Sequence, residues 1–339
     1  MSISSELIHR PFTGETPSRR GVAGGALLAV LWLSAALAAI AFSLANTVRG
    51  ETERTATAIE ALRCQYLAEA GVERGILHIK WGLDNSMPPD APLRYRPGTP
   101  FLPFSFPSGE ALVEVIPETA KLNINRSQPD LLLRLLVAMG VDPGHAEQIV
   151  AAIVDWRSPA GLTPFDAFYL SRAPSFRARH ASFEEVEELL LVRGITRDIY
   201  YGTYSRNEAG QLIPRPGLKD CVSIFGTTET FDINTAQPPV LTALGMPPQT
   251  VAAIVARRRM QPFRSVAEAA AFTGPAPGFS RLRVGGNSIF TVRATARVRL
   301  PNGQLSDLRR SAAATVKFMP PGYDATVQVM RWYENAWTP

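Results

Sequence analysis

The sequence has few of the residues from which disulfide scaffolds, metal centres and catalytic sites are built. Its 339 residues include two cysteines, Cys64 and Cys221, which excludes a disulfide-stapled scaffold and a four-cysteine zinc site. Its four histidines are never three, four or five residues apart, so the sequence has no helical zinc pair. The G-x-S-x-G, G-x-x-x-x-G-K-[ST] and strand-linked G-x-G-x-x-G motifs are also missing, which removes the hydrolase, P-loop and dinucleotide-binding classes. We therefore expect no enzymatic activity.

An excess of one charge is missing as well. Lys and Arg number 35 and Asp and Glu 30, a net charge of +5 that is spread along the chain, so charge alone does not indicate a nucleic-acid partner. Hydrophobic residues make up 46% and charged residues 19% of the chain, an ordinary globular composition. A chain of this length is expected to fold into about two domains.

By contrast, one long apolar run stands near the amino terminus. Residues 22–45 carry no charge, and as a helix rising ~1.5 Å per residue they would reach about 36 Å, enough to cross a bilayer. The run is longer than the ~7–15 apolar residues typical of a cleaved secretory signal. Arg10, Arg19 and Arg20 precede it, which places the leader in the cytoplasm by the positive-inside rule. We expect one membrane crossing, with the bulk of the chain on the opposite side.

A helical pattern continues beyond the apolar run. Ile59, Leu62, Tyr66, Leu67 and Ala70 recur at the spacing of one helix face, with charged residues elsewhere. The sequence therefore predicts one long helix with an apolar first half and an amphipathic second half.

This arrangement resembles type IV pilins and the pseudopilins of type II secretion, in which a basic leader precedes such a helix. The leader here ends with two arginines directly before Gly21. In that family the prepilin peptidase, a membrane aspartyl peptidase, cuts after a glycine and methylates the new amino terminus. The resemblance implies a cut between Gly21 and Val22, with Gly24 and Gly25 as alternative positions.

One family feature is missing from the apolar run. Major pilins carry a glutamate at the fifth mature position, where it pairs with the amino terminus of a neighbouring subunit. Counting from Gly21, this position is Ala26, and the first acid after the cut is Glu51. An unpaired carboxylate in lipid is costly. The minor pseudopilin K family (general secretion pathway protein K) lacks this glutamate and is placed at the filament tip, and the chain resembles that family.

Strand patterns occupy both sides of a helical middle region. The proline-rich residues 87–107 are expected to form a loop, followed by a strand over 111–116. Residues 290–300 alternate apolar and polar, as in a strand with one buried face. Residues 301–303, Pro-Asn-Gly, predict a turn, after which 313–319 and 325–332 are expected to complete a small antiparallel sheet.

The middle of the chain contains a diverged internal repeat. One copy starts LNINR at Leu122 and the other FDINTA at Phe231. Each continues as a helix, a tight turn, a second helix ending in Trp-Arg or Arg-Arg, and a Phe-x-x-Val-x-Glu segment that opens another helix. We expect Asn125 and Asn234 to be the N-caps of the first helices. The repeat resembles the helix-hairpin-helix pattern.

A membrane-anchored DNA-binding protein of the competence type would use the same repeat, and is the alternative function. In DNA-binding versions the backbone N–H groups of a Gly-x-Gly hairpin hold a phosphate. Here Pro143, Pro247 and Pro248 remove donors, and Asp142 adds a charge that repels phosphate. The arginines 257–259 are expected to interact with the C-terminal carbonyls of their own helix. We therefore expect no nucleic-acid partner.

The resemblance to the pseudopilin K family covers nearly the whole chain, and Trp156 and Arg157 belong to its most specific segments. It implies an α+β fold: a pilin-like long N-terminal helix on a small antiparallel sheet, with a large inserted all-α domain of two helix-hairpin-helix-like (SAM-like) repeats. The domains that follow are a cytoplasmic leader (1–21), a transmembrane half-helix (22–46), an amphipathic half-helix with the first strands (47–121), the inserted domain (122–285) and the C-terminal strands (286–339).

The resemblance also implies a function. It predicts a minor pseudopilin that caps and helps initiate the type II secretion pseudopilus, supporting protein export across the outer membrane. The chain would be a single-pass protein of the bacterial inner membrane with its bulk in the periplasm. Its partners would be the minor pseudopilins H, I and J, the major pseudopilin, the inner-membrane assembly platform and the prepilin peptidase.

A few single residues carry further expectations. Pseudopilins often bind calcium, so the resemblance raises calcium as a cofactor, without assigned ligands and without EF-hand spacing. The glutamates of residues 184–188, near Asp166, are expected to form a solvated helix face. Trp156 and Tyr169 are expected in the core. Cys64 is expected to be a small buried hydrophobe, with a disulfide to Cys221 as the alternative.

Overall fold

A computed structural model describes residues 22–83, 88, 91, 94–159, 163–206, 210–320 and 322–336. The leader, with Gly21, lies outside the described residues, as do the side chains of residues 22–24 and 83. The chain divides into two compact units, Met1–Ile59 and Glu60–Pro339, which are described separately.

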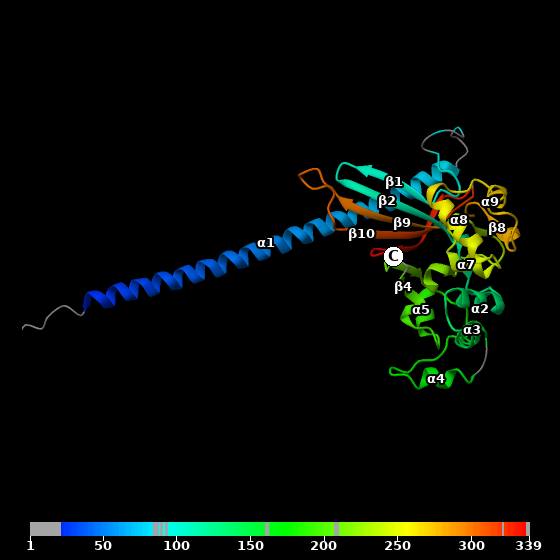
Figure 1. Cartoon of the computed structure of the whole chain (residues 1–339), viewed down its shortest axis with the longest axis horizontal. Coiled ribbons are helices and arrows are strands. Elements are labelled where there is room, and N and C mark those ends of the chain that lie inside the picture. The colour runs from blue at the N-terminus through cyan, green and yellow to red at the C-terminus, as the bar shows by residue number, and fades with distance from the viewer. Residues whose placement is uncertain are drawn as a thin grey trace, which may run out of the picture. The chain divides into compact units, whose positions relative to one another are not determined.

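One helix, α1 (Val22–Leu83), contains the apolar run and continues through the boundary between the units (Figure 1). In the first unit every side chain from residue 25 to residue 49 is exposed, large apolar ones included. Among the described residues α1 is the one helix long and apolar enough to cross a membrane, with a mean hydropathy of 2.4 in its most apolar window. The predicted long helix is therefore confirmed.

The second unit contains a five-stranded antiparallel sheet in the order β1-β2-β9-β10-β11. Its strands are β1 (Phe101–Phe106), β2 (Gly109–Pro117), β9 (Ile289–Val298), β10 (Arg310–Phe318) and β11 (Val327–Tyr333). The four strands expected from the sequence are all present, with small shifts at their ends. In β9 every second residue from Phe290 to Val298 is buried, as its alternation predicted.

The edge strand β1 corrects the expectation that residues 87–107 form a loop. It pairs with β2 along its whole length, with Phe104 opposite Ala111. Pro103 is tolerated because a strand at the sheet edge has one side that needs no N–H donor. The many prolines of this segment favoured a loop, so the strand was not predicted from the sequence. Its residue Leu102 is buried in the core between the sheet and α1.

The second half of α1 packs on this sheet through small residues. Cys64 and Ala68 are fully buried there, and one turn further on Gly71 faces the strands. A Cβ atom added at Gly71 would lie 2.9 Å from the Cβ atoms of Ala111 on β2 and Ala294 on β9. Helix and sheet backbones are therefore closer together than any larger residue at this position would permit.

This packing corrects the predicted apolar stripe of α1. Leu67 is buried as expected, but Leu62 is 56% and Tyr66 63% exposed. Ile59, at the end of the first unit, is also about half exposed. The prediction failed because the sheet selects side chains by size, and glycine, alanine and cysteine score weakly in an apolar pattern.

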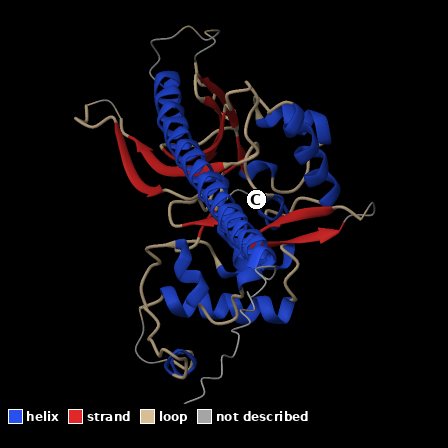
Figure 2. Cartoon of the chain, turned by 90° about the vertical axis from the view of Figure 1, so that its left-hand side faces the viewer, coloured by secondary structure: helices blue, strands red, loops and turns tan. Residues whose placement is uncertain are grey.

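Between β2 and β9 the chain forms mainly short helices, which Figure 2 shows in two groups. The first group comprises α2 (Pro129–Ala138), α3 (Pro143–Arg157), α4 (Asp166–Leu170), the 3₁₀ helix η3 (Val186–Leu191) and α5 (Arg197–Tyr201). The second comprises α7 (Pro238–Ala243), α8 (Pro248–Met260), α9 (Val266–Thr273) and the 3₁₀ helix η4 (Phe279–Arg281). Helices α2 and α7 pack against each other.

Three two-stranded pairs and two short helices complete this region. β3 (Leu122–Asn123) pairs in parallel with β6 (Val222–Ser223), and β7 (Phe231–Asp232) in parallel with β8 (Leu282–Arg283). β4 (Gly202–Arg206) and β5 (Leu212–Pro216) form an antiparallel pair, and η2 (Glu118–Ala120) and α6 (Leu218–Cys221) are single turns.

Two separate hydrophobic cores hold the second unit together. One lies between α1 and the sheet, and the other lies within the helical region. Trp156 and Tyr169 are 3% and 0% exposed in the helical core, which confirms the prediction for both. Cys64 and Cys221 are free thiols buried in different cores, so Cys64 is the small buried hydrophobe expected and the disulfide is not formed.

Candidate functional site

The start of α1 holds the residues to which the sequence assigns processing and lateral pairing. Val22 is its first helical residue, and Ala26 is an exposed side chain in its second turn. The first turn carries no acid. Within the run, Ser34 Oγ donates to the Val30 carbonyl of its own helix at 2.8 Å. The cut at Gly21, Gly24 or Gly25 stays a prediction.

In the helical region Asn125 and Asn234 occupy equivalent places, although neither is an N-cap. Asn125 Nδ2 donates to the Phe183 carbonyl at 3.0 Å, and the Phe183 N–H donates to Asn125 Oδ1 at 2.8 Å. Asn234 makes the same two bonds with Phe263, both 2.9 Å long. Each asparagine therefore fixes a distant segment of the main chain.

The N-cap prediction was wrong because of the prolines that follow. Gln128 and Gln237 are the actual N-caps, both extended and without a side-chain capping bond, and Pro129 and Pro238 open the helices. Proline is well suited to the first helical position and holds the preceding residue extended. Each asparagine consequently lies three residues before the N-cap, and its side-chain amide bonds to the main chain of a distant segment instead.

An arginine completes the same arrangement in each group. Arg157 donates to the carbonyls of Ile124 at 2.6 Å and Ser127 at 2.7 Å. Arg258 donates to the Ile233 carbonyl at 2.7 Å. Burial lowers the pKa of both guanidiniums, that of Arg258 to about 10, so both remain charged at neutral pH. We call each asparagine and arginine pair, Asn125 with Arg157 and Asn234 with Arg258, a clamp.

In each group a glutamate of the following segment contacts the residue just before the clamp arginine. Glu188 accepts from Trp156 Nε1 at 3.3 Å, and Glu268 accepts from Arg257 Nη2 at 3.2 Å. Each glutamate also accepts a main-chain N–H near the start of its own helix, from Glu185 and from Arg264 respectively. Two distant stretches thus share one pattern of contacts.

The hairpins between the paired helices do not present a phosphate site. The Asp142 carboxylate accepts the His145 N–H at 3.1 Å and so occupies the first turn of α3. Pro143 and Pro248 stand at the first positions of α3 and α8, without an N–H. Arg257 donates to the Gln261 carbonyl at its own helix end, as predicted, at 2.6 Å. Arg258 donates to the Ile233 carbonyl and not to the carbonyls at the end of its own helix. The prediction was therefore wrong for Arg258.

The acidic residues 184–188 are engaged with arginines. Arg179 pairs with Glu184 and Glu188, and Arg331 on β11 pairs with Glu185 and Glu187 at 3.3 Å each. No group of three or more His, Cys, Asp or Glu side chains suited to a metal ion occurs within the described ranges.

Asp166 contacts a histidine instead of those glutamates. Its carboxylate accepts the Thr163 N–H at 2.8 Å and lies 3.2 Å from His180 Nε2. The Thr163 bond and then His180 lower the pKa of Asp166. Burial lowers the pKa of His180, but its bonds to Asp166 and to the Asp155 carbonyl raise it by more, so the net pKa is raised.

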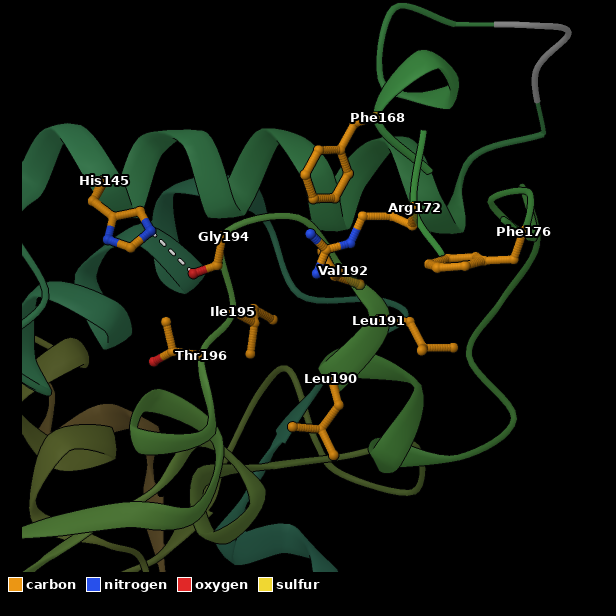
Figure 3. A pocket seen from close by; sticks show the side chains of 10 residues that line it. All are labelled: His145, Phe168, Arg172, Phe176, Leu190, Leu191, Val192, Gly194, Ile195 and Thr196. Carbon is orange, nitrogen blue, oxygen red and sulfur yellow. Dashed lines mark hydrogen bonds between the residues drawn. The ribbon is translucent and has the colours of Figure 1, made fainter. Parts of the chain in front are cut away.

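A cavity of about 310 Å³ lies between α3, α4 with the loop after it, and the end of η3 with the segment that follows, and the sequence did not indicate it (Figure 3). Its lining residues are His145, Phe168, Arg172, Phe176, Leu190, Leu191, Val192, Gly194, Ile195 and Thr196. They come from three stretches of chain that lie apart in the sequence. The one local signal was Arg172 standing between Phe168 and Phe176 in a short segment.

Comparison with known proteins gives consistent results. The family described as type II secretion system (T2SS), protein K matches in two parts, over residues 111–202 and 231–284. The type II secretion system protein K of Pseudomonas aeruginosa is 26% identical over 248 residues, which cover 67% of this chain and 69% of that protein. A chain in the crystal structure of the GspK-GspI-GspJ complex from the enterotoxigenic Escherichia coli Type 2 Secretion System is 17% identical, with a TM-score of 0.52. That alignment covers 85% of this chain and all of the other and shows a shared fold.

Proposed function

We propose that this chain belongs to the type II secretion system protein K family, which it matches in two parts, and that it is the minor pseudopilin that caps the pseudopilus and helps to initiate it. The observation that carries the proposal is the build of α1. Its first half is exposed and apolar, and its second half is fixed to a sheet through small residues. A pseudopilin needs an apolar helical segment that is stable in lipid or among the helices of other subunits. It also needs a folded domain that follows this segment.

The missing acid supports a position at the filament end. A subunit inside the filament would use a fifth-position carboxylate to pair with its neighbour's amino terminus, and this chain has Ala26 there when the cut follows Gly21. Without that carboxylate the subunit makes no such pair, while its apolar run rests in lipid at no electrostatic cost. The terminal place is the one where the pair is not needed.

The helical region supplies the bulk of a cap. We infer that residues 122–285 are an inserted domain of two helix-hairpin-helix-like repeats, flanked by the half-helix and strands of 47–121 and the strands of 286–339. What supports this is the clamp of Asn125 and Arg157 and its counterpart of Asn234 and Arg258, with matching bonds. Their hydrogen bonds, buried or partly buried, connect distant segments of the domain, which suits a blocking element above a filament.

The partners and the location follow from the same proposal. The solved complex contains GspI and GspJ beside GspK, and we extend these two partners, with pseudopilin H and the major pseudopilin, to this chain. The prepilin peptidase would cut the leader, and the assembly platform would receive the anchored protein. We place α1 residues 22–46 in the inner membrane and the second unit in the periplasm, where it acts by binding and without catalysis.

Two measurements on the full chain test the proposal. Affinity isolation from solubilised membranes should recover pseudopilins I and J with the wild-type chain, and mass spectrometry should find an amino terminus at residue 22 only in cells that contain the prepilin peptidase. An intact leader in cells that process their other pilins would contradict it. Binding of duplex DNA at moderate salt would favour the competence-type alternative.

A further inference from the structure

The cavity next to α4 combines apolar walls with one unpartnered charge. Phe168, Phe176 and Leu190 contribute ring and aliphatic surface to it. Figure 3 shows the Arg172 side chain reaching from the loop after α4 into the space beside Phe168. Within the described part of the chain the Arg172 guanidinium makes no hydrogen bond or ion pair, and its one polar contact is with the Phe168 ring, 5.2 Å from the ring centre.

The charge around the cavity is positive and is not balanced by its lining. Arg193 stands over the same Phe168 ring at 5.3 Å from its centre, so two guanidiniums pack on one aromatic ring. No Asp or Glu is among the residues that line the cavity. Two cations on one ring repel each other, and an anion bound at Arg172 would relieve that repulsion.

The far wall of the cavity is held in a fixed position. His145 Nε2 donates to the Gly194 carbonyl at 3.0 Å, and a carbonyl only accepts, so this nitrogen carries the hydrogen. Gly194 has φ +90°, and a Cβ there would lie 2.9 Å from Ile149 and 3.3 Å from the His145 ring. Glycine therefore brings this strip of backbone against α3, and the cavity keeps its shape without a ligand.

We propose that this cavity binds the carboxyl-terminal residue of a polypeptide, with its apolar side chain against Phe168 and Phe176 and its carboxylate on Arg172. The planar guanidinium fork matches a carboxylate in a two-bond arrangement. A volume of about 310 Å³ is at the lower end for ligand cavities, which suits one large side chain and its terminal group. This site is independent of the pseudopilus assignment, because it uses none of the residues of α1 or the sheet.

The test uses the full chain in lipid nanodiscs and two small probes that differ in one group. N-acetyl-phenylalanine carries the carboxylate and N-acetyl-phenylalanine amide does not. Isothermal titration calorimetry should show the acid binding at least about tenfold more tightly than the amide, the difference that a charge-assisted pair provides. In R172Q this preference should disappear, whereas R172K should keep part of it.

Arg177 provides the matched control, since it is an exposed arginine of the same loop that does not line the cavity. R177Q should bind both probes as the wild type does, and circular dichroism should show all three variants folded. Equal affinity for acid and amide, or equal losses in R172Q and R177Q, would overturn the proposal. Octanoate binding more tightly than N-acetyl-phenylalanine would also overturn it, in favour of a fatty-acid site.

Discussion

Replacing Gly71 by alanine should destabilise the second unit, although the same change at an open helical position is favourable. The new Cβ would lie 2.9 Å from two other Cβ atoms, those of Ala111 and Ala294, and neither can rotate away because each is fixed to a strand backbone. Overpacking of this kind costs about 1–3 kcal/mol. The helix propensity of alanine returns about 1 kcal/mol, which leaves a net loss of roughly 0–2 kcal/mol.

Gly50 is the matched control because it lies in the same helix and a Cβ added there meets nothing within 4 Å. Gly50→Ala should therefore cost no stability. Thermal unfolding of the full chain in detergent micelles, followed by near-ultraviolet circular dichroism, would compare the two variants. A domain of this size shifts its Tm by about 2–4 °C for each kcal/mol.

A second change tests the cause of the loss. Ala294→Gly removes one of the two facing Cβ atoms, so combining it with Gly71→Ala should cost less than the sum of the single changes. A Gly71→Ala protein that melts at or above the wild-type temperature, together with additive single effects, would show that α1 does not pack on β2 and β9 at this point. The basis of the pilin-like assignment would then be lost.

Three further predictions concern other parts of the chain. Asn234→Ala should cost about 1–3 kcal/mol in urea unfolding, because it leaves a buried N–H and carbonyl unpaired, and Asn125→Ala should cost less because that site is more exposed. Since the pKa of His180 is raised, its contact with Asp166 should stabilise the fold below pH ~6.5 and lose that effect as pH rises through the folded-state pKa; His180→Gln should flatten this part of the unfolding profile between pH 5.5 and 8. Leu33→Arg should leave the second unit's melting unchanged and reduce the fraction of chain recovered in the membrane pellet, because it puts a charge at the centre of the apolar run; unchanged recovery would contradict the placement of this run in lipid.

The fold could be predicted from the sequence where a periodic pattern is strong. The alternation of β9 and the uncharged length of α1 each identify an element and its buried or exposed face without reference to distant residues. The buried stripe of α1 could not be found in this way. Its residues, such as Gly71 and Ala68, are small because the sheet is close, and that distance is a property of the packed structure.

The sequence identified several residues of the candidate site, but it did not predict which residues they contact. Asn125 and Asn234 stood out by position, but the prolines four residues after each of them decide the helix start, and the partners Phe183 and Phe263 lie 58 and 29 residues away. No local rule connects them. The cavity around Arg172 was not predicted at all, because its walls come from three stretches that only the folded chain brings together.

The two halves of α1 suit different surroundings. This difference bears on what could drive the apolar half from the membrane into a filament. In the first unit large side chains such as Leu31, Trp32 and Ile40 are each more than half exposed, so water is not their resting environment. Lipid tails and sister helices are similarly apolar, so moving the run from one to the other changes its hydrophobic free energy little. Without a carboxylate in the run, the transfer gains nothing from charge pairing either. Under the proposed function, the driving force for leaving the bilayer would then come from contacts of the folded second unit with neighbouring subunits, which suits a subunit that starts a filament through this unit.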